Sequence, residues 1–129
     1  MGAIAALLAA LGGAATGVTA VLLASRAFTV EVSGRSMIPT LEPGDWLLAV
    51  RAGRIERGDL VVVRHPDRDL ELVKRVTGLP GEGGLGPDLY LVVGDNPEES
   101  TDGRAFGPVK RSSIGGVVVA RYRPRPRLL

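Results

Sequence analysis

One lysine stands where the pattern of a strand calls for an apolar residue. In the segment Leu70-Glu-Leu-Val-Lys-Arg-Val76, alternation along an extended strand puts Lys74 on the same face as Leu70 and Leu72. A buried ammonium is costly, so a lysine there tends to lose its proton, and a neutral amine near pH 7 is a general base. The alternative is a lysine at a strand end whose ammonium reaches water or pairs with a carboxylate.

One serine lies in a loop with the composition of a tight turn. In the segment Val32-Ser-Gly-Arg-Ser-Met-Ile-Pro-Thr-Leu-Glu-Pro-Gly-Asp45, Ser36 follows Gly34 by two residues and precedes Pro39, whose ring stiffens the turn. A serine hydroxyl is a poor nucleophile until a nearby base activates it. Ser36 alone therefore indicates no reaction.

The elements that must position these two residues are strands. Gly, Pro and Asp in Glu42-Pro-Gly-Asp45, Arg57-Gly-Asp59 and the segment 79–87 are typical of turns, and no sustained helical period of apolar residues occurs after residue 26. We therefore predict an all-β domain, a compact and strongly bent antiparallel sheet or small barrel. The expected strands span residues 28–32, 46–50, 60–63, 70–76, 89–93 and 117–122.

The beginning of the chain has a different character. The chain has 16 Lys plus Arg and 14 Asp plus Glu, all at or after Arg26, so the first 25 residues carry no charge. At about 1.5 Å per residue, a helix from Ala3 to Ala24 reaches roughly 33 Å, enough to cross a bilayer core. We predict a transmembrane anchor over 1–25, a folded domain over 28–122 and a basic C-terminal tail over 123–129.

A cleaved signal peptide is the competing interpretation of residues 1–25, because Ser25 and Ala27 are small residues at the spacing that cleavage needs. The segment lacks a basic region before the apolar core and exceeds the usual apolar length, which favours a retained anchor. Arg26 follows the span, and the positive-inside rule alone would keep the domain in the cytoplasm. Gly13 and Gly17 form a G-x-x-x-G pattern that permits self-association of helices.

Composition excludes several classes of protein. The chain has no Cys, which excludes disulfide scaffolds and cysteine-ligated zinc sites, and we expect neither a metal nor a cofactor. Nucleic-acid binding is not expected, because the basic run trails into the tail instead of covering a folded face. That run comprises Lys110, Arg111, Arg121, Arg123, Arg125 and Arg127.

Three segments, in this order and spacing, carry a family resemblance. They are the Ser36 loop given above, Lys74-Arg-Val-Thr-Gly-Leu-Pro-Gly-Glu82, and Gly94-Asp-Asn-Pro-Glu-Glu-Ser-Thr-Asp-Gly-Arg-Ala-Phe-Gly-Pro-Val109. Together they resemble the bacterial type I signal peptidases and their mitochondrial inner-membrane relatives, which are serine peptidases with a Ser/Lys dyad. The resemblance covers about residues 30–109 and implies a signal-peptidase-like catalytic domain.

The resemblance implies that Ser36 is the nucleophile and Lys74 the general base. This agrees with the chemistry of the residues, since a desolvated amine can replace the histidine of the usual triad. The nucleophile loop includes Gly34, Met37 and Pro39, and the backbone N–H of Ser36 is expected to donate to the developing oxyanion.

The third segment supplies supporting residues in the family. Ser100 matches the serine that hydrogen-bonds and orients the lysine. Asp102 and Arg104 match an ion pair, and Asp95 with Asn96 matches the turn that positions this loop. These roles are implied by the resemblance alone.

The sequence also departs from the family. Gly34 stands where some members have a serine whose hydroxyl is the second oxyanion donor, and Gly103 where serine is common. Only residues 83–93 separate the second and third segments, where larger bacterial enzymes insert a second domain, so this is a minimal catalytic core. The only histidine, His65, does not match the base position and is expected to be an exposed loop residue.

In the family the substrate lies extended between two segments, here about 29–33 and 71–74. Pairing with strand edges, together with shallow pockets, selects small side chains at the positions one and three before the cut. The expected substrate-binding residues are Val32, Ser33, Leu72 and Val73.

The leading hypothesis is a membrane-anchored serine endopeptidase that cleaves signal or leader peptides from preproteins after small residues. We expect a single-pass protein of the bacterial plasma membrane, rather than the mitochondrial inner membrane, with its catalytic domain outside the cytoplasm. Its expected partners are preproteins and the bilayer. The short length and the Gly94-Asp-Asn-Pro97 loop also resemble maturation peptidases of nickel-type superoxide dismutase. A catalytically silent, membrane-tethered binding subunit is the third hypothesis.

Overall fold

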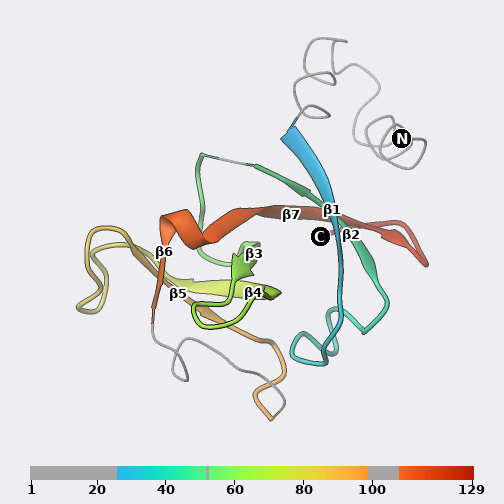
Figure 1. Cartoon of the computed structure of the whole chain (residues 1–129), viewed down its shortest axis with the longest axis horizontal. Helices are drawn as coiled ribbons and strands as arrows, with labels where there is room; N and C mark the ends of the chain where they lie inside the picture. The colour runs from blue at the N-terminus through green and yellow to red at the C-terminus, as the bar shows by residue number, and fades with distance from the viewer. Residues whose placement is uncertain (1–25, 52, 99–107) are drawn as a thin grey trace.

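Short strands joined by turns account for nearly all the regular structure of the residues that the computed structural model describes, which are 26–51, 53–98 and 108–129 (Figure 1). The prediction of an all-β domain is therefore confirmed. Within these ranges the elements are β1 (Ala27–Glu31), β2 (Trp46–Val50), β3 (Leu60–Arg64), β4 (Glu71–Gly78), β5 (Leu89–Val93), β6 (Val109–Lys110), the short 3₁₀ helix η1 (Arg111–Ser113), β7 (Ile114–Arg123) and β8 (Arg127–Leu128).

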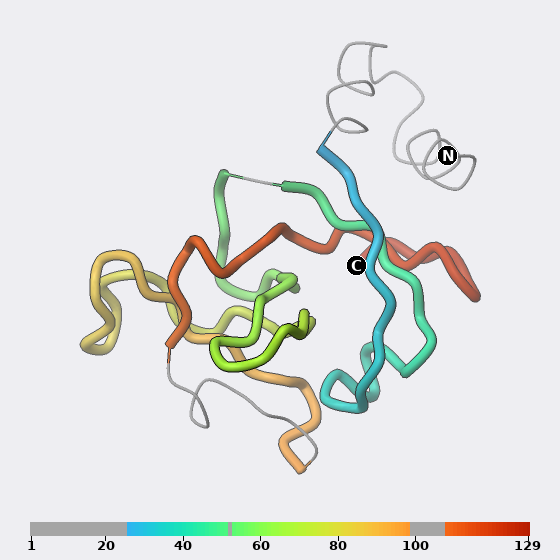
Figure 2. Tube along the Cα trace, viewed as in Figure 1, coloured from blue at the N-terminus to red at the C-terminus, as the bar shows by residue number. Residues whose placement is uncertain are grey.

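The strands form one curled antiparallel sheet, a half-barrel. Its order over the described residues is β1-β2-β7-β3-β4-β5-β6, with β8 beside β7. Figures 1 and 2 show the long β7 running across the molecule, with β1 and β2 crossing one of its ends and β5 and β6 near the other. The registers of β7 with β2 and with β3 both shift, and such bulges bend a sheet. The predicted bent sheet is thus confirmed.

Strand β3 is buried on both faces, which explains why Leu60-Val-Val-Val63 shows no alternation of polar and apolar residues. Val62 belongs to one hydrophobic cluster, and Val61 and Val63 belong to another. The first cluster also holds Met37 and Leu41, which lie just after Ser36. The core therefore fixes the loop in which the candidate nucleophile lies.

The C-terminal segment folds back on the sheet. Ala120 and Arg121 of β7 pair with Leu128 and Arg127 of β8, so residues 123–129, predicted as a basic tail, include a short strand with exposed side chains. Arg121 donates through Nε to the carbonyl of Arg125 (3.0 Å) and forms an ion pair with the buried Asp45 (3.3 Å).

The predicted membrane anchor, residues 1–25, lies outside the described residues. Among the residues that are described, no helix has the length and apolar character needed to span a bilayer.

Two adjacent glycines of β7 differ in the space around them. A Cβ on Gly116 would lie 2.7 Å from Cε1 of Phe28 and 2.7 Å from the carbonyl oxygen of Val50. A Cβ on Gly115 would lie 3.8 Å from the nearest atom, the carbonyl oxygen of Val62. Gly116 therefore lets β1 and β2 approach β7 closely, whereas a Cβ on Gly115 would make only ordinary van der Waals contacts.

We predict that Gly116→Ala lowers the free energy of unfolding by about 1–3 kcal/mol, because overpacking against backbone cannot relax easily. Gly115→Ala is the matched control and is expected to have a much smaller effect. Denaturant unfolding of both variants, followed by circular dichroism, measures the difference. Equal stabilities for the two variants would show that the close approach at Gly116 is not a constraint.

Candidate active site

The loop that carries Ser36 is anchored by the residue next to it. Met37 is 1% exposed and lies in the core. The backbone N–H of Leu41 donates to the carbonyl of Met37 (2.9 Å), and the N–H of Ile38 donates to the carbonyl of Arg35 (3.3 Å). Ser36 itself is half-buried. The loop is thus a hydrogen-bonded turn whose position is fixed by the burial of Met37.

The turn after β5 holds the same loop from the other side. The backbone N–H of Asn96 donates to the carbonyl of Ser36 (2.8 Å), and Nδ2 of Asn96 donates to the carbonyl of Arg35 (3.0 Å). The N–H of Asp95 contacts Sδ of Met37 (3.4 Å). Asn96 therefore hydrogen-bonds to the backbone of the Ser36 loop, and Asp95 contacts the side chain of Met37 in the same loop. The family resemblance associates both residues with loop positioning.

The carboxylate of Asp95 joins that loop to β4. Arg75 donates to it with both Nε and Nη2, at 2.9 and 2.8 Å, and the hydroxyl of Thr40 donates to Oδ2 at 2.5 Å. Nη1 of Arg75 donates to the carbonyl of Gly58 (2.9 Å). The bidentate pair fixes Arg75, the residue that follows Lys74 in the sequence.

These contacts keep Asp95 ionised. The hydrogen bond from Arg75 lowers the pKa of Asp95 against the opposing effect of burial, and the Thr40 hydroxyl adds to the lowering. The same hydrogen bond raises the pKa of Arg75. The pair therefore remains charged and bonded throughout the neutral range.

Lys74 is buried, which is the interpretation that alternation left open and that the family resemblance favoured. It is 1% exposed and pairs in register with Val61 of β3, which is also buried. Val76, on the same face of β4, is fully buried. The interpretation in which this lysine reaches water at a strand end is therefore wrong.

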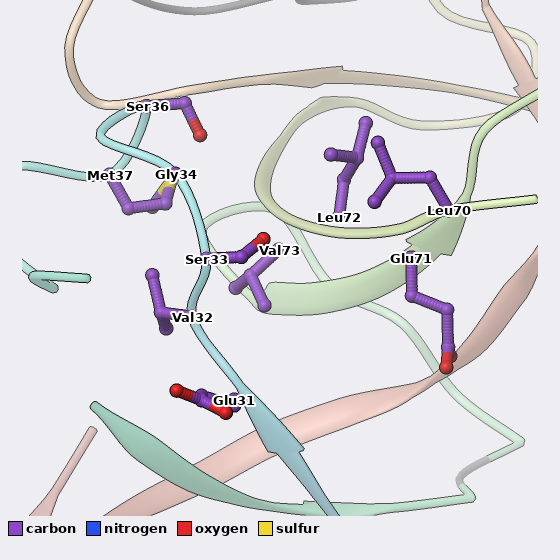
Figure 3. Close-up of a pocket in the computed structure, with 10 residues that line it drawn as sticks. All are labelled: Glu31, Val32, Ser33, Gly34, Ser36, Met37, Leu70, Glu71, Leu72 and Val73. Atoms are coloured by element: carbon purple, nitrogen blue, oxygen red, sulfur yellow. The ribbon is translucent and has the colours of Figure 1, made fainter. Parts of the chain in front are cut away.

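Ser36 opens on a pocket of about 160 Å³ between two parts of the chain. Figure 3 shows Val32, Ser33 and the Ser36 turn on one side of it, and Leu72 and Val73 on the other. All four residues predicted to bind substrate line this pocket with Ser36. The full lining is Glu31, Val32, Ser33, Gly34, Ser36, Met37, Leu70, Glu71, Leu72 and Val73.

Each wall of the pocket includes part of a strand edge, Glu31 of β1 on one side and residues 71–73 of β4 on the other. Among the described residues β1 pairs with β2 alone, and the pairing of β4 with β5 begins only at Arg75. The edge of β4 over residues 71–74 and the outer edge of β1 are consequently unpaired by strands in the described part of the chain. Edges of this kind accept an extended peptide as an added strand.

Several residues singled out from the sequence do not line this pocket. Ser100, Asp102 and Arg104 lie outside the described residues. Pro39 is exposed in the turn after Ser36. His65 is half-buried, not exposed as predicted, because its turn closes on it: Nδ1 accepts the backbone N–H of Asp67 (3.0 Å).

Sequence reasoning assigned no role to Thr40 and Arg75. Both residues lie inside the motifs that carry the resemblance. For Arg75 the available signal was the alternation of side chains along the strand. Since Lys74 faces the core, Arg75 must face the other way, where a charged residue needs a partner. The identity of that partner, 20 residues away, depends on how β5 returns beside β4.

Comparisons with known proteins identify the family of this chain. The sequence profile of the family described as signal peptidase, peptidase S26, matches residues 4–83 and 84–123. The chain belongs to this signal peptidase family.

Its relatives come from bacteria and mitochondria. The mitochondrial ATP-independent inner membrane protease subunit 1a of Arabidopsis thaliana is 38% identical, with 74% of this chain and 70% of the relative covered. Human mitochondrial inner membrane protease subunit 1 is 32% identical, covering 74% of this chain and 69% of the relative. Signal peptidase I of Leptolyngbya laminosa is 32% identical, covering 82% of this chain and 75% of the relative.

We predict that Asp95→Asn lowers the free energy of unfolding at pH 7 by about 2 kcal/mol, because it replaces charged hydrogen bonds to a partly buried arginine. The folded-state pKa of Asp95 is lowered, so its stabilisation is complete above the unfolded pKa of about 3.9 and is lost as pH falls through the folded pKa. The stability difference between wild type and Asp95→Asn should therefore shrink below about pH 4.

Denaturant unfolding at a series of pH values measures this difference. Asp88→Asn, the same change at an exposed position, is the control and should leave the profile unchanged. A difference between wild type and Asp95→Asn that stays constant from pH 7 to pH 3 would contradict the role of the ionised carboxylate.

Proposed function

We propose that this chain is a serine endopeptidase that removes N-terminal signal or leader segments from preproteins, with Ser36 as nucleophile and Lys74 as general base. One observation carries the proposal. The loop of Ser36 and the strand of the buried Lys74 are tied together through Asp95, and Ser36 opens on a groove with two unpaired strand edges.

In the proposed reaction the neutral amine of Lys74 takes the proton of the Ser36 hydroxyl as Oγ attacks the scissile carbonyl. The backbone N–H of Ser36 donates to the oxyanion that forms. The ammonium of Lys74 then returns the proton to the leaving amine as the C–N bond breaks. A water molecule, deprotonated by Lys74, then attacks the ester. As the acyl C–Oγ bond breaks, the ammonium of Lys74 gives that proton to Oγ, which releases the acid product, free Ser36 and the neutral amine.

The substrate is proposed to lie extended between β1 and residues 71–74 of β4, pairing with both edges. The half-barrel supports this, since a peptide in that position would complete the sheet where it is open. The pocket beside Ser36 is small and lined by Val32, Met37 and Val73, which suits small side chains next to the cut.

The remaining roles are proposals from the family resemblance. Ser100 would hydrogen-bond and orient Lys74, and Asp102 with Arg104 would support the loop that carries Ser100. The nearby turn of Asp95 and Asn96 contacts the nucleophile loop, which is consistent with a third segment that organises the site.

We also propose that residues 1–25 anchor the chain in a bacterial plasma membrane as a single span, with the catalytic domain, residues 28–122, outside the cytoplasm. The uncharged composition of 1–25 supports the anchor. Relatives whose names place them in the mitochondrial inner membrane support a membrane location. The substrate's leader would then reach the groove as it leaves the bilayer.

Ser36→Ala and Lys74→Met are each expected to reduce cleavage of a leader peptide by at least about 10³-fold, because a serine without its base is a poor nucleophile. Methionine fills the buried space of the lysine stem without its amine. The assay is the release of a fluorescent product by the full chain in detergent, with Lys110→Met as the exposed control. Retention of full activity by Lys74→Met would show that the base is another group.

Gly34 provides a test of the oxyanion site. A Cβ on Gly34 would meet no atom within 4 Å, so a serine fits there without displacing the loop. We predict that Gly34→Ser raises kcat by about tenfold or more, because its hydroxyl supplies a second oxyanion donor. Gly34→Ala, which has the same Cβ and no hydroxyl, should leave kcat near that of wild type. Equal kcat values for the two variants would mean that the hydroxyl does not reach the oxyanion.

A further inference from the structure

A second, more polar hollow of about 350 Å³ adjoins the pocket beside Ser36. Leu70 and Glu71 line both spaces, so the two are adjacent along the wall that leads into β4. Figure 3 shows the side chain of Glu71 extending away from the Ser36 end of the groove. The hollow is lined by Phe28, Arg51, Arg64, Asp69, Leu70, Glu71 and Gly115.

The fold brings two arginines to the floor of this hollow. Arg51 follows β2 and Arg64 ends β3, and both strands pair with β7 close to Gly115. Gly115 also lines the hollow and has no side chain to fill it. The guanidinium of Arg51 lies 4.9 Å from the centre of the Phe28 ring, which holds it against β1.

The charges that line the hollow do not neutralise one another in pairs. Arg64 and Glu71 are opposite in register, yet within the described part of the chain no ion pair joins Arg64, Asp69 and Glu71. All three side chains are exposed. The guanidinium of Arg64 and the carboxylates of Asp69 and Glu71 therefore remain available to a bound molecule.

We propose that this hollow is a second subsite of the groove, which takes a substrate side chain that both donates and accepts hydrogen bonds, a carboxamide of the Gln or Asn type. The inference rests on the proposed function, since it takes a peptide in the groove as given. A carboxamide oxygen accepts from a guanidinium while its NH₂ donates to a carboxylate. A charged side chain would face a like charge, and an apolar one would dehydrate charged groups without replacing their hydrogen bonds.

The spacing fixes which substrate residue is involved. Val32 lines the pocket beside Ser36 and Phe28 lines the hollow, four residues apart along an extended segment, or about 13 Å at roughly 3.3 Å per residue. An extended peptide whose last three residues before the cut fill the pocket would reach the hollow with residues about five to seven before the cut.

Peptide binding tests the subsite independently of cleavage. Fluorescent leader peptides carry Gln, Leu, Lys or Glu at each position from four to eight before the cut, and fluorescence anisotropy measures Kd for the full-length Ser36→Ala chain in detergent. We expect Gln to bind about fivefold more tightly than Leu, and more tightly than Lys or Glu, at one or two positions between five and seven only.

Two double variants identify the residues responsible. Arg64→Ala/Glu71→Ala should abolish the preference for Gln. Arg54→Ala/Glu56→Ala, which removes an exposed arginine and glutamate that line neither space, should preserve it. Absence of a positional preference, a preference for Lys or Glu, or a Gln preference unchanged in Arg64→Ala/Glu71→Ala would overturn the proposal.

Cleavage of the same peptides by the wild-type chain distinguishes a failure of the proposed peptidase function from a failure of the proposed subsite. Peptides that bind with the expected pattern and are not cleaved count against the proposed function and leave the subsite standing. Peptides that are cleaved without the pattern count against the subsite alone. Failure of every peptide to bind would overturn both.

Discussion

The carboxylate of Asp95 joins three segments that are far apart in the sequence. It accepts two hydrogen bonds from Arg75 on β4 and one from Thr40 at the end of the Ser36 loop. The next residue in the chain, Asn96, donates a hydrogen bond to the backbone of the same loop. A loop is a poor place for a nucleophile unless rigid elements fix it. Here the loop is fixed by the buried Met37 on one side and by the Arg75–Asp95 ion pair on the other. The position of Ser36 relative to β4 therefore depends on the Arg75–Asp95 ion pair together with the core contact of Met37.

A peptidase also needs a place for an extended peptide, and the curl of the sheet provides a groove of that kind. β1 forms one edge of the sheet, and β5 pairs with only the later part of β4, so the two unpaired edges border the same groove. The groove is small and apolar beside Ser36 and charged where it passes Arg51 and Arg64. In the proposed function, this change of polarity would let the same strands bind the residues next to the cut and discriminate among those farther from it.

The sequence was sufficient for the main strands and for the burial of Lys74. Turn residues bounded the predicted strands, and 46–50 and 89–93 match the structure at both ends. Alternation placed Lys74 on the face of Leu70 and Leu72 but left open whether its amine reaches water, and the family resemblance favoured the buried base. Strands β6 and β8 have two residues each, too few to show any pattern. The partners of Arg75 and Thr40, and the half-burial of His65, depend on how distant segments meet, which no local spacing encodes.

The central claim is that the buried amine of Lys74 activates Ser36. The most direct test is the rate at which a serine-reactive acylating probe modifies Ser36 as pH is varied, with modification located by mass spectrometry. The account predicts that the rate rises with pH through a single deprotonation, and that in Lys74→Met the rise disappears and the rate falls to that of an ordinary serine. A rate and pH profile unchanged by Lys74→Met would contradict it.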